Sequence, residues 1–150
     1  MSSLDNIKSK FEKSGFWRLL GIKIQQLIPG KAVIHLKISE DIMNLNKHVH
    51  GGVINSLLDS AMGVTLRSIH DVPYVTQSIT TQFLTSSKEE GSLYASAKII
   101  RKGSRIICIQ GEVTNDNSTL IAHSIATFIA PPKNQEEDLN SLHLKKECFK

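Results

Sequence analysis

The spacing of hydrophobic positions changes along this chain, and the change separates one strong helix from a series of strands. Between Val53 and Leu66, apolar residues recur with the period of a helix and form a broad apolar stripe. Because few polar positions interrupt that stripe, we expect this helix to be buried on most sides and to end near residues 68–70. A shorter amphipathic pattern over residues 4–13 predicts a first helix.

Elsewhere apolar and polar residues alternate, as in half-buried strands. The alternation predicts six strands, separated by turn residues and by a polar loop over residues 39–49, while residues 16–20 look like an apolar connector. The predicted strands cover residues 21–28, 31–38, 75–84, 93–100, 106–114 and 120–129. This order predicts an α+β architecture in which an antiparallel sheet of about six strands encloses one helix. One such helix packed on one sheet leaves part of its broad apolar surface uncovered, which favours a homo-oligomer.

Length and composition limit the class of protein and the number of domains. A chain of 150 residues that is 40% hydrophobic suits a single domain with its own core and is too apolar for a disordered protein. We divide it into an N-terminal extension (1–14), one domain (15–132) and a charged tail (133–150). No segment has the length and apolarity of a membrane span, and the N-terminus lacks the pattern of a secretory signal. Cys108 in an apolar run and Cys148 in the tail indicate a cytoplasmic protein without a disulfide scaffold.

The formal net charge of +4 is concentrated in one stretch. The tail from Lys133 nets zero, and residues 91–111 hold Lys98, Arg101, Lys102 and Arg105 with no acid between the two glycines. This patch is either a solvated hairpin turn or a site for a small anion such as a nucleotide phosphate. Few aromatic residues accompany it, so we do not expect nucleic-acid binding.

The segment from Asn44 to Gly63 carries the most chemical information. Gly51 and Gly52 lie where a loop becomes a buried helix, so their N–H groups are among those without partners inside the helix. They lack Cβ atoms and sit at the positive end of the helix dipole, which suits a developing oxyanion such as that of a thioester or ester carbonyl. Asp59 lies two turns further in, where a carboxylate is costly unless it is paired or has a function.

Plainer interpretations stay open for the same residues. One alternative is that Asp59 bonds only a neighbouring serine or an N–H of a partner chain, and another is that His50 only caps the helix. His48 and His50 have no further ligands at metal spacing, so no metal site is expected. Neither a G-x-S-x-G elbow, nor a cysteine with a suitable histidine and acid, nor a P-loop or G-x-G-x-x-G motif is found. Nucleophilic Ser or Cys hydrolysis, nucleotide hydrolysis and Rossmann chemistry are therefore not expected.

One constellation resembles a known family. The pattern Asn44-(x5)-His50-Gly51-Gly52-(x6)-Asp59-(x3)-Gly63, followed by Val75-Thr76, resembles the PaaI-type branch of the hotdog-fold acyl-CoA thioesterases over roughly residues 15–132. Later matches are Gly91…Ala95, Arg101-Lys102-Gly103, Gly111-Glu112-Val113 and Ala122…Ala126-Thr127-Phe128. The resemblance implies a bent sheet wrapped around the central helix, sheets joined edge to edge in a dimer, and dimers that often pair into tetramers. It implies hydrolysis of acyl-CoA to free acid and CoA at sites shared between subunits, with no cofactor beyond the coenzyme A of the substrate.

The resemblance also assigns roles to individual residues. It gives Gly51 the N–H that polarises the carbonyl and Asp59 the role of nucleophile or general base. It places Asn44 near the thioester or the lytic water, His50 in shaping the oxyanion loop, and Thr76 where some relatives have a serine that positions water. The expected contacts with the acyl group or with CoA are Gly52, Met62, Val75, Arg101, Lys102, Gly103, Ser104 and Arg105.

Two other functions of a hotdog domain remain as alternatives. A dehydratase acting on 3-hydroxyacyl thioesters would use a histidine and an acid, for which His50 and Asp59 are candidates. A non-catalytic acyl-CoA sensor would carry a DNA-binding module, for which the about 15 residues before the domain are too few. The pattern leaves open whether the acyl group is medium-chain, long-chain or aryl, and whether its carrier is coenzyme A or acyl carrier protein.

Overall fold

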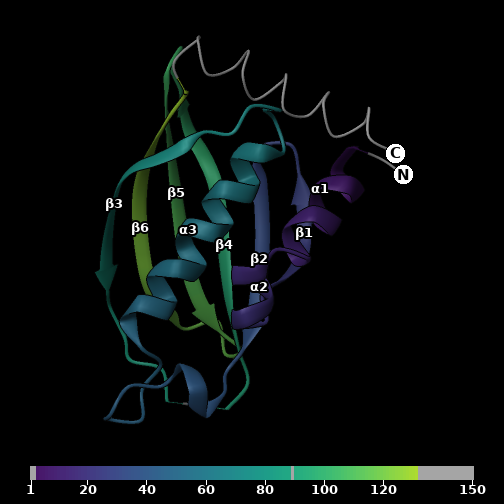
Figure 1. Ribbon diagram of the computed structural model, residues 1–150. Coiled ribbons are helices and arrows are strands. Elements are labelled where there is room, and N and C mark those ends of the chain that lie inside the picture. Colours follow the sequence, from purple (N-terminus) through teal and green to yellow (C-terminus); the bar gives the residue numbers. More distant parts are fainter. Residues whose placement is uncertain (1–2, 89, 132–150) are drawn as a thin grey trace.

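Six antiparallel strands form one sheet that curves around the helix α3 in this computed structural model, which describes residues 3–88 and 90–131 (Figure 1). The helices are α1 (Ser3–Glu12), α2 (Gly15–Leu20), a 3-10 turn (Glu40–Ile42) and α3 (Gly51–Arg67). The strands are β1 (Lys23–Ile28), β2 (Lys31–Lys37), β3 (Val75–Phe83), β4 (Ser92–Lys102), β5 (Ile106–Asn115) and β6 (Leu120–Ile129). This arrangement confirms the predicted α+β class. The predicted tail, with Cys148, lies outside the described residues.

The connector predicted over residues 16–20 is wrong, because these residues form the helix α2. Six residues span less than two helical turns, so their apolar positions show no period that sequence reading could use. The helix ends at Gly21, which adopts a left-handed conformation with φ 69°. Its turn carries Trp17 into the core, where the indole meets the ring of Phe11 edge-on at 5.2 Å between centroids.

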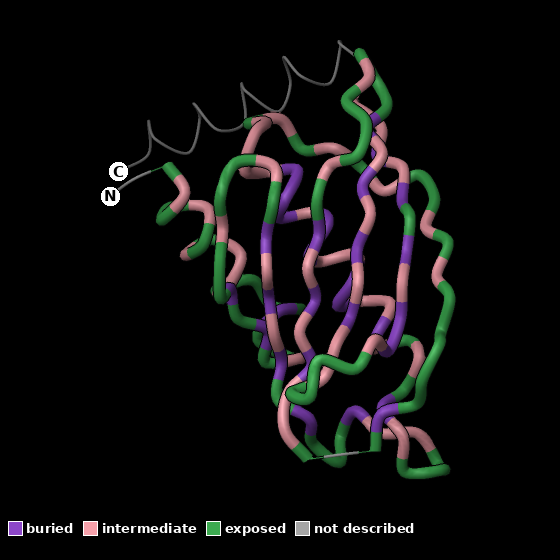
Figure 2. The backbone as a smooth tube through the Cα atoms, turned by 180° about the vertical axis from the view of Figure 1, so that it is seen from behind, coloured by how far each residue is buried: buried purple, intermediate pink, exposed green. Residues whose placement is uncertain are grey.

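The strand order is β1-β2-β4-β5-β6-β3, so the chain crosses the sheet between β2 and β3. Helix α3 makes that crossing and packs on one face of the sheet, while α1 lies beside β1 (Figure 1). The crossing leaves β3 at an edge. Figure 2 looks at the sheet from behind; β3, like β1 at the other edge, is exposed along most of its length.

Small residues let α3 lie close to the middle of the sheet. Ala97, Gly111 and Ser124 stand side by side on β4, β5 and β6, beneath the helix. A Cβ atom at Gly111 would be 2.8 Å from the terminal methyl carbon (Cε) of Met62 and 3.2 Å from a methyl carbon of Leu58. The side chains of α3 therefore fill the space that larger residues on the sheet would take.

A β-bulge at the start of β3 decides which way Thr76 points. Thr76 pairs with Phe128 and Ser78 with Thr127, so one extra residue, Gln77, stands between two consecutive pairs. Strict alternation would put Thr76 on the same face as Ser78, which is exposed. The bulge instead puts Thr76 on the helix-facing side of the sheet, where the buried Phe128 opposite it also lies.

Among the described helices, none combines the length and apolarity that crossing a bilayer requires.

Candidate functional site

Helix α3 brings Asp59 against the edge strand. The Thr76 hydroxyl donates a hydrogen bond of 2.8 Å to Oδ1 of Asp59. The carboxylate is neither fully buried nor exposed, and its second oxygen takes part in no hydrogen bond among the described residues. Asp59 is thus held by one neutral donor, with an oxygen left to act on a ligand or water.

A second polar link lies one helical turn before Asp59. The Thr81 hydroxyl lies 2.6 Å from Oδ1 of Asn55 and 3.1 Å from Oγ of Ser124. Asn55 and Asp59 are four residues apart and so share one face of the helix. Two threonines of β3 therefore contact this polar face of α3, and they fix the position of Asp59 along the strand.

Asp59 and Thr76 line a pocket of about 290 Å³. The apolar part of its wall comes from the first helix, from α3, from the loop after α3 and from β6, through Phe11, Leu66, Val72, Pro73, Tyr74 and Phe128. Gly63 and Arg67 complete the lining. The pocket is therefore mostly apolar, with a carboxylate and a guanidinium among its few charged groups.

The N-terminus of α3 has one free donor. His50 is the N-cap, and its Nδ1 accepts a 2.9 Å hydrogen bond from the N–H of Gly52. The N–H groups of Val53 and Ile54 both donate to the carbonyl of His50, at 2.9 and 3.2 Å. Among the described residues, the N–H of Gly51 has no acceptor. His50 thus acts as the cap that leaves Gly51 available, at the positive end of the helix dipole.

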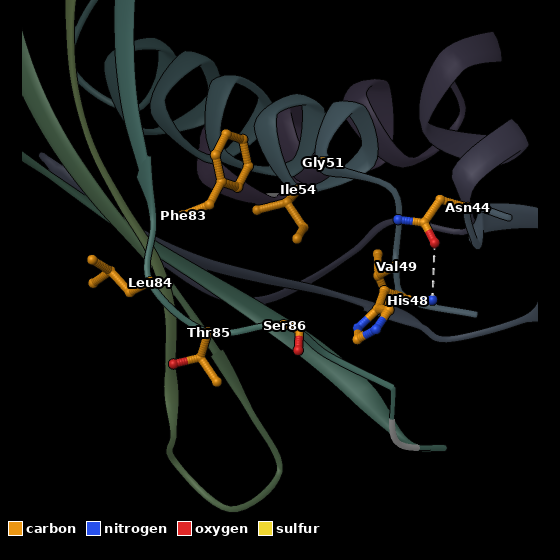
Figure 3. A pocket seen from close by; sticks show the side chains of 9 residues that line it. All are labelled: Asn44, His48, Val49, Gly51, Ile54, Phe83, Leu84, Thr85 and Ser86. Atoms are coloured by element: carbon orange, nitrogen blue, oxygen red, sulfur yellow. Dashed lines mark hydrogen bonds between the residues drawn. The ribbon is translucent and has the colours of Figure 1, made fainter. Parts of the chain in front are cut away.

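The Gly51 donor borders a second pocket, of about 330 Å³, shown in Figure 3. The side chains of Ile54 and Phe83 lie on one side of it and those of His48 and Ser86 on the other (Figure 3). Asn44 lines the pocket but is also tied into the loop, because its Oδ1 accepts from the N–H groups of Asn46 and His48 at 2.9 and 3.1 Å. Its side chain thus holds the loop that leads to Gly51.

Within one chain the two pockets are separate. Gly51 and Asp59 are eight residues apart on one helix, which is about 12 Å along its axis. Asn44, His50 and Gly51 gather at the N-terminal end of α3, whereas Asp59 and Thr76 lie in its second half. One carbonyl group cannot contact both Gly51 and Asp59 of the same chain.

The basic hairpin lies at the opposite end of α3 from Gly51. Arg101 and Lys102 end β4, and residues 103–105 form the tight turn to β5, where the N–H of Gly103 donates to the carbonyl of Ile106 at 3.0 Å. Burial lowers the pKa of His70, just after α3, and the nearby positive charge of Lys102 lowers it further, while Asp71 acts in the opposite direction. This electrostatic contact places the hairpin beside the C-terminal end of α3. Ser104, Arg101 and Arg105 are exposed there.

Three other residues predicted to contact the acyl group or CoA do not lie together in one pocket. The N–H of Gly52 is taken by its bond with His50. Met62 is completely buried above Gly111 and lines neither of the two pockets. Val75 is 60% exposed at the start of the edge strand, next to Thr76.

Sequence reasoning missed several residues that the structure brings to these pockets. Phe11 reaches the Asp59 pocket from the N-terminal extension, and Arg67 lies two turns beyond Asp59 on the same helix. One signal in the sequence could have indicated Arg67. It follows Asp59 and Gly63 at intervals of four residues, so all three lie on one face of the helix. No pattern along the chain could indicate Phe11, because its place depends on how α1 packs against α3.

Within the described part of the chain, no three His, Cys, Asp or Glu side chains lie close enough together to hold a metal ion.

Comparison with known proteins agrees with this geometry. A family model described as the thioesterase superfamily matches residues 46–122, from the loop before Gly51 to the start of β6. A Saccharolobus solfataricus protein provisionally named an esterase is 27% identical over 124 residues, which are 81% of this chain and 88% of that protein. The acyl-coenzyme A thioesterase PaaI of Escherichia coli is 25% identical over 117 residues, 78% of this chain and 83% of PaaI.

Solved structures show the same fold. The structure of E. coli PaaI superposes with a TM-score of 0.80 at 23% identity, over 85% of this chain and 92% of that one. A hypothetical thioesterase of Streptococcus pneumoniae, solved with coenzyme A, has a TM-score of 0.70 at 19% identity, over 73% and 85% of the two chains. The family match covers half of the chain and includes both Gly51 and Asp59. The chain therefore belongs to the thioesterase superfamily, as a PaaI-like member with the hotdog fold.

Proposed function

We propose that this protein hydrolyses acyl-CoA thioesters to a free acid and coenzyme A, with Asp59 acting on the attacking water. The observation that carries the proposal is the Asp59 carboxylate, held by Thr76 at one pocket, together with the N–H of Gly51 at another, which has no acceptor in residues 3–88 and 90–131. Carboxylate-assisted attack and a backbone oxyanion donor are sufficient for this reaction without a metal or cofactor. The free thiol of Cys108 in β5 fits a cytoplasmic location, which is part of the same proposal.

The proposed site needs two copies of the chain. Gly51 and Asp59 lie about 12 Å apart along one helix, so a site of both must combine Gly51 of one copy with Asp59 of another. The edge strand β3 presents unpaired backbone groups, the usual starting point for pairing with a second strand. Phe83 lies on the helix-facing side of that strand and is still 55% exposed, which favours cover by a partner. We propose a dimer joined along β3, either alone or paired with a second dimer in a tetramer.

The reaction balances without any other reactant. As the water oxygen attacks the thioester carbonyl carbon, Asp59 takes a proton from that water. The carbonyl oxygen becomes negative, and the N–H of Gly51 stabilises it at the positive end of α3. The carbonyl then re-forms, the C–S bond breaks, and the thiolate leaves and takes up the proton. The other path is direct attack by Asp59, which forms an acyl anhydride that water then opens.

Recognition of the coenzyme A part is assigned to the basic hairpin. Arg101, Lys102 and Arg105 are exposed at the turn after β4, and cations so placed attract the phosphates of a nucleotide. Coenzyme A in the S. pneumoniae structure and the name of E. coli PaaI support this carrier. The proposed dehydratase alternative is less favoured, because His50 Nδ1 is occupied by the N–H of Gly52 and caps the helix.

The test is a hydrolysis screen of short-chain, medium-chain, long-chain and aryl acyl-CoAs, in which the release of free thiol is measured. Wild-type protein should hydrolyse at least one class, and Asp59→Asn should lower kcat about 10²- to 10⁴-fold without changing the unfolding temperature. Asp41→Asn, which removes an exposed carboxylate of the 3-10 turn, is the matched control and should keep full activity. Equal rates for Asp59→Asn and wild type would reject the assignment. Single turnover in ¹⁸O-labelled water, with the label traced into Asp59, distinguishes nucleophile from general base.

A further inference from the structure

Arg67 is the one residue of the Asp59 pocket whose charge the proposed reaction does not use. Its Nη1 donates to the carbonyls of His70, at 3.4 Å, and of Asp71. The side chain is only partly exposed, and no salt bridge to it occurs among the described residues. A half-buried guanidinium bound to two neutral carbonyls retains N–H groups that can bind an anion.

The floor between Asp59 and Arg67 is open. Asp59, Gly63 and Arg67 follow one another at intervals of four residues, so they lie along one stripe of α3. Apart from the two neighbours of Gly63 in the chain and the nearby backbone of α3 itself, no heavy atom of the described residues lies within 4 Å of the position where a Cβ of Gly63 would stand. Phe11, Tyr74 and Phe128 supply apolar wall to the same pocket. The result is a channel with apolar sides, a carboxylate at one end and a cation at the other.

The length of this channel selects an acyl group. Asp59 and Arg67 are eight residues apart, which is about 12 Å along the helix axis. An extended chain advances about 1.2 Å per bond, and the attacking water and the contact with Arg67 take part of the span, so about six to ten carbons fit between them. A shorter acyl group would leave Arg67 without a partner.

We propose that the acyl group lies in this channel and ends in a carboxylate that Arg67 binds, so that the preferred substrates are ω-carboxyacyl thioesters of medium length. The proposal rests on the thioesterase function proposed above, with Asp59 beside the reacting carbonyl. Apolar walls suit the methylene chain of such a group and do not suit the hydrated phosphates of coenzyme A, for which the exposed hairpin is available.

The first arm of the test compares two substrates of equal chain length, suberoyl-CoA and octanoyl-CoA. The wild type should show a kcat/KM for suberoyl-CoA about tenfold to hundredfold higher, as expected for a hydrogen-bonded charge pair. Arg67→Gln should remove this preference by raising KM for suberoyl-CoA, with little change for octanoyl-CoA. Arg18→Gln, which removes an exposed arginine of α2, is the matched control and should keep the preference.

A second variant leaves Arg67 and its carbonyl bonds untouched. Gly63→Leu places a side chain in the open floor of the channel while keeping good helix propensity. It should lower kcat/KM for suberoyl-CoA and for octanoyl-CoA at least tenfold, because the leucine side chain takes the space of the acyl group. Full activity of Gly63→Leu on suberoyl-CoA would show that the acyl group lies elsewhere.

The second arm measures binding without turnover, by calorimetry with thioether analogues of the two substrates. Tighter binding of the carboxylate-ended analogue, lost in Arg67→Gln, supports the inference even if no thioester is hydrolysed, and in that case only the catalytic proposal fails. Hydrolysis of octanoyl-CoA at a rate equal to or above that of suberoyl-CoA, with equal binding of the two analogues, overturns the inference and leaves the thioesterase function standing. Absence of binding by both analogues overturns it as well.

Discussion

Thr76 reaches Asp59 across the space between the edge strand and the central helix, with 2.8 Å between the hydroxyl oxygen and the carboxylate oxygen. The bulge at Gln77 makes this contact possible, since it turns Thr76 to the side that faces the helix. A carboxylate at the surface of a mostly buried helix gains from such a donor, which fixes its rotamer and its position.

Thr76 is therefore expected to position Asp59, and its hydroxyl is the group to test. Thr76→Val should lower kcat about tenfold and leave KM nearly unchanged, because the shape stays and one hydrogen bond is lost. Thr76→Ser should restore most of the rate. Thr80→Val, on the exposed face of the same strand, controls for the loss of a threonine hydroxyl. Identical kcat values for Thr76→Val and Thr80→Val would exclude a positioning role.

Proline at position 51 removes the proposed oxyanion donor selectively. Gly51 is the first residue of α3, where proline is well tolerated, and the preceding His50 already has the extended ψ of 132° that a following proline requires. Its N–H has no acceptor among the described residues, so the fold should lose no hydrogen bond. We expect Gly51→Pro to lower kcat about 10²- to 10³-fold with little change in unfolding temperature.

The matched variant for that experiment is Gly51→Ala, which keeps the N–H. A Cβ at this position would lie 3.5 Å from the ring of Phe83, an ordinary contact. A rate for Gly51→Ala well above that of Gly51→Pro assigns the effect to the missing donor. Two equally slow variants would instead point to crowding of the pocket beside Phe83.

A shared site predicts complementation between two inactive variants. In a mixed dimer of Asp59→Asn and Gly51→Pro chains, one site receives both substitutions and the other receives neither. Co-refolding equal amounts should place about half of the chains in mixed dimers and restore about a quarter of the wild-type activity, since each mixed dimer has one intact site of two. Activity that stays at the level of the separate variants would show that one chain supplies the whole site, or that the chains do not assemble this way.

His70 predicts a pH-dependent contribution to stability. Burial first, and then the charge of Lys102, lower its pKa in the folded state, against the smaller opposing effect of Asp71. The unfolded chain then takes up this proton before the folded one does, so the contribution of His70 to stability is lost as the pH falls below about 6.5. The difference in unfolding temperature between wild type and His70→Asn should shift against the wild type between pH 7.5 and pH 5. A difference that is constant over this range would contradict the prediction.

The sequence predicts the elements whose periods are long enough to read. The stripe from Val53 to Leu66 identifies α3, and the six alternating segments identify the strands within a few residues. The helix α2 was missed because its six residues are held by Trp17 packing in the core, a tertiary contact that leaves no local period.

The site divides in the same way. The glycine pair and the acid at fixed spacing indicate Gly51 and Asp59, because helix geometry follows directly from spacing. The bulge that turns Thr76 inward and the approach of Phe11 to the Asp59 pocket depend on how separate elements pack, so the residue pattern alone does not contain them. The separation of the two pockets follows from helix length. The proposal that one site combines residues of two chains depends in addition on the exposed edge strand β3, which the residue pattern does not identify as an edge.

The close approach at Gly111 has a consequence far from its own strand. Because a methyl group at Gly111 would push against the ends of the Met62 and Leu58 side chains, the glycine lets α3 lie close to the sheet. The gap that the Thr76 hydroxyl bridges depends on that distance, since Thr76 belongs to the sheet and Asp59 to the helix. Gly111 thus influences the spacing between Thr76 and Asp59, and we expect a larger residue there to displace the Asp59 carboxylate before it lowers the stability of the core.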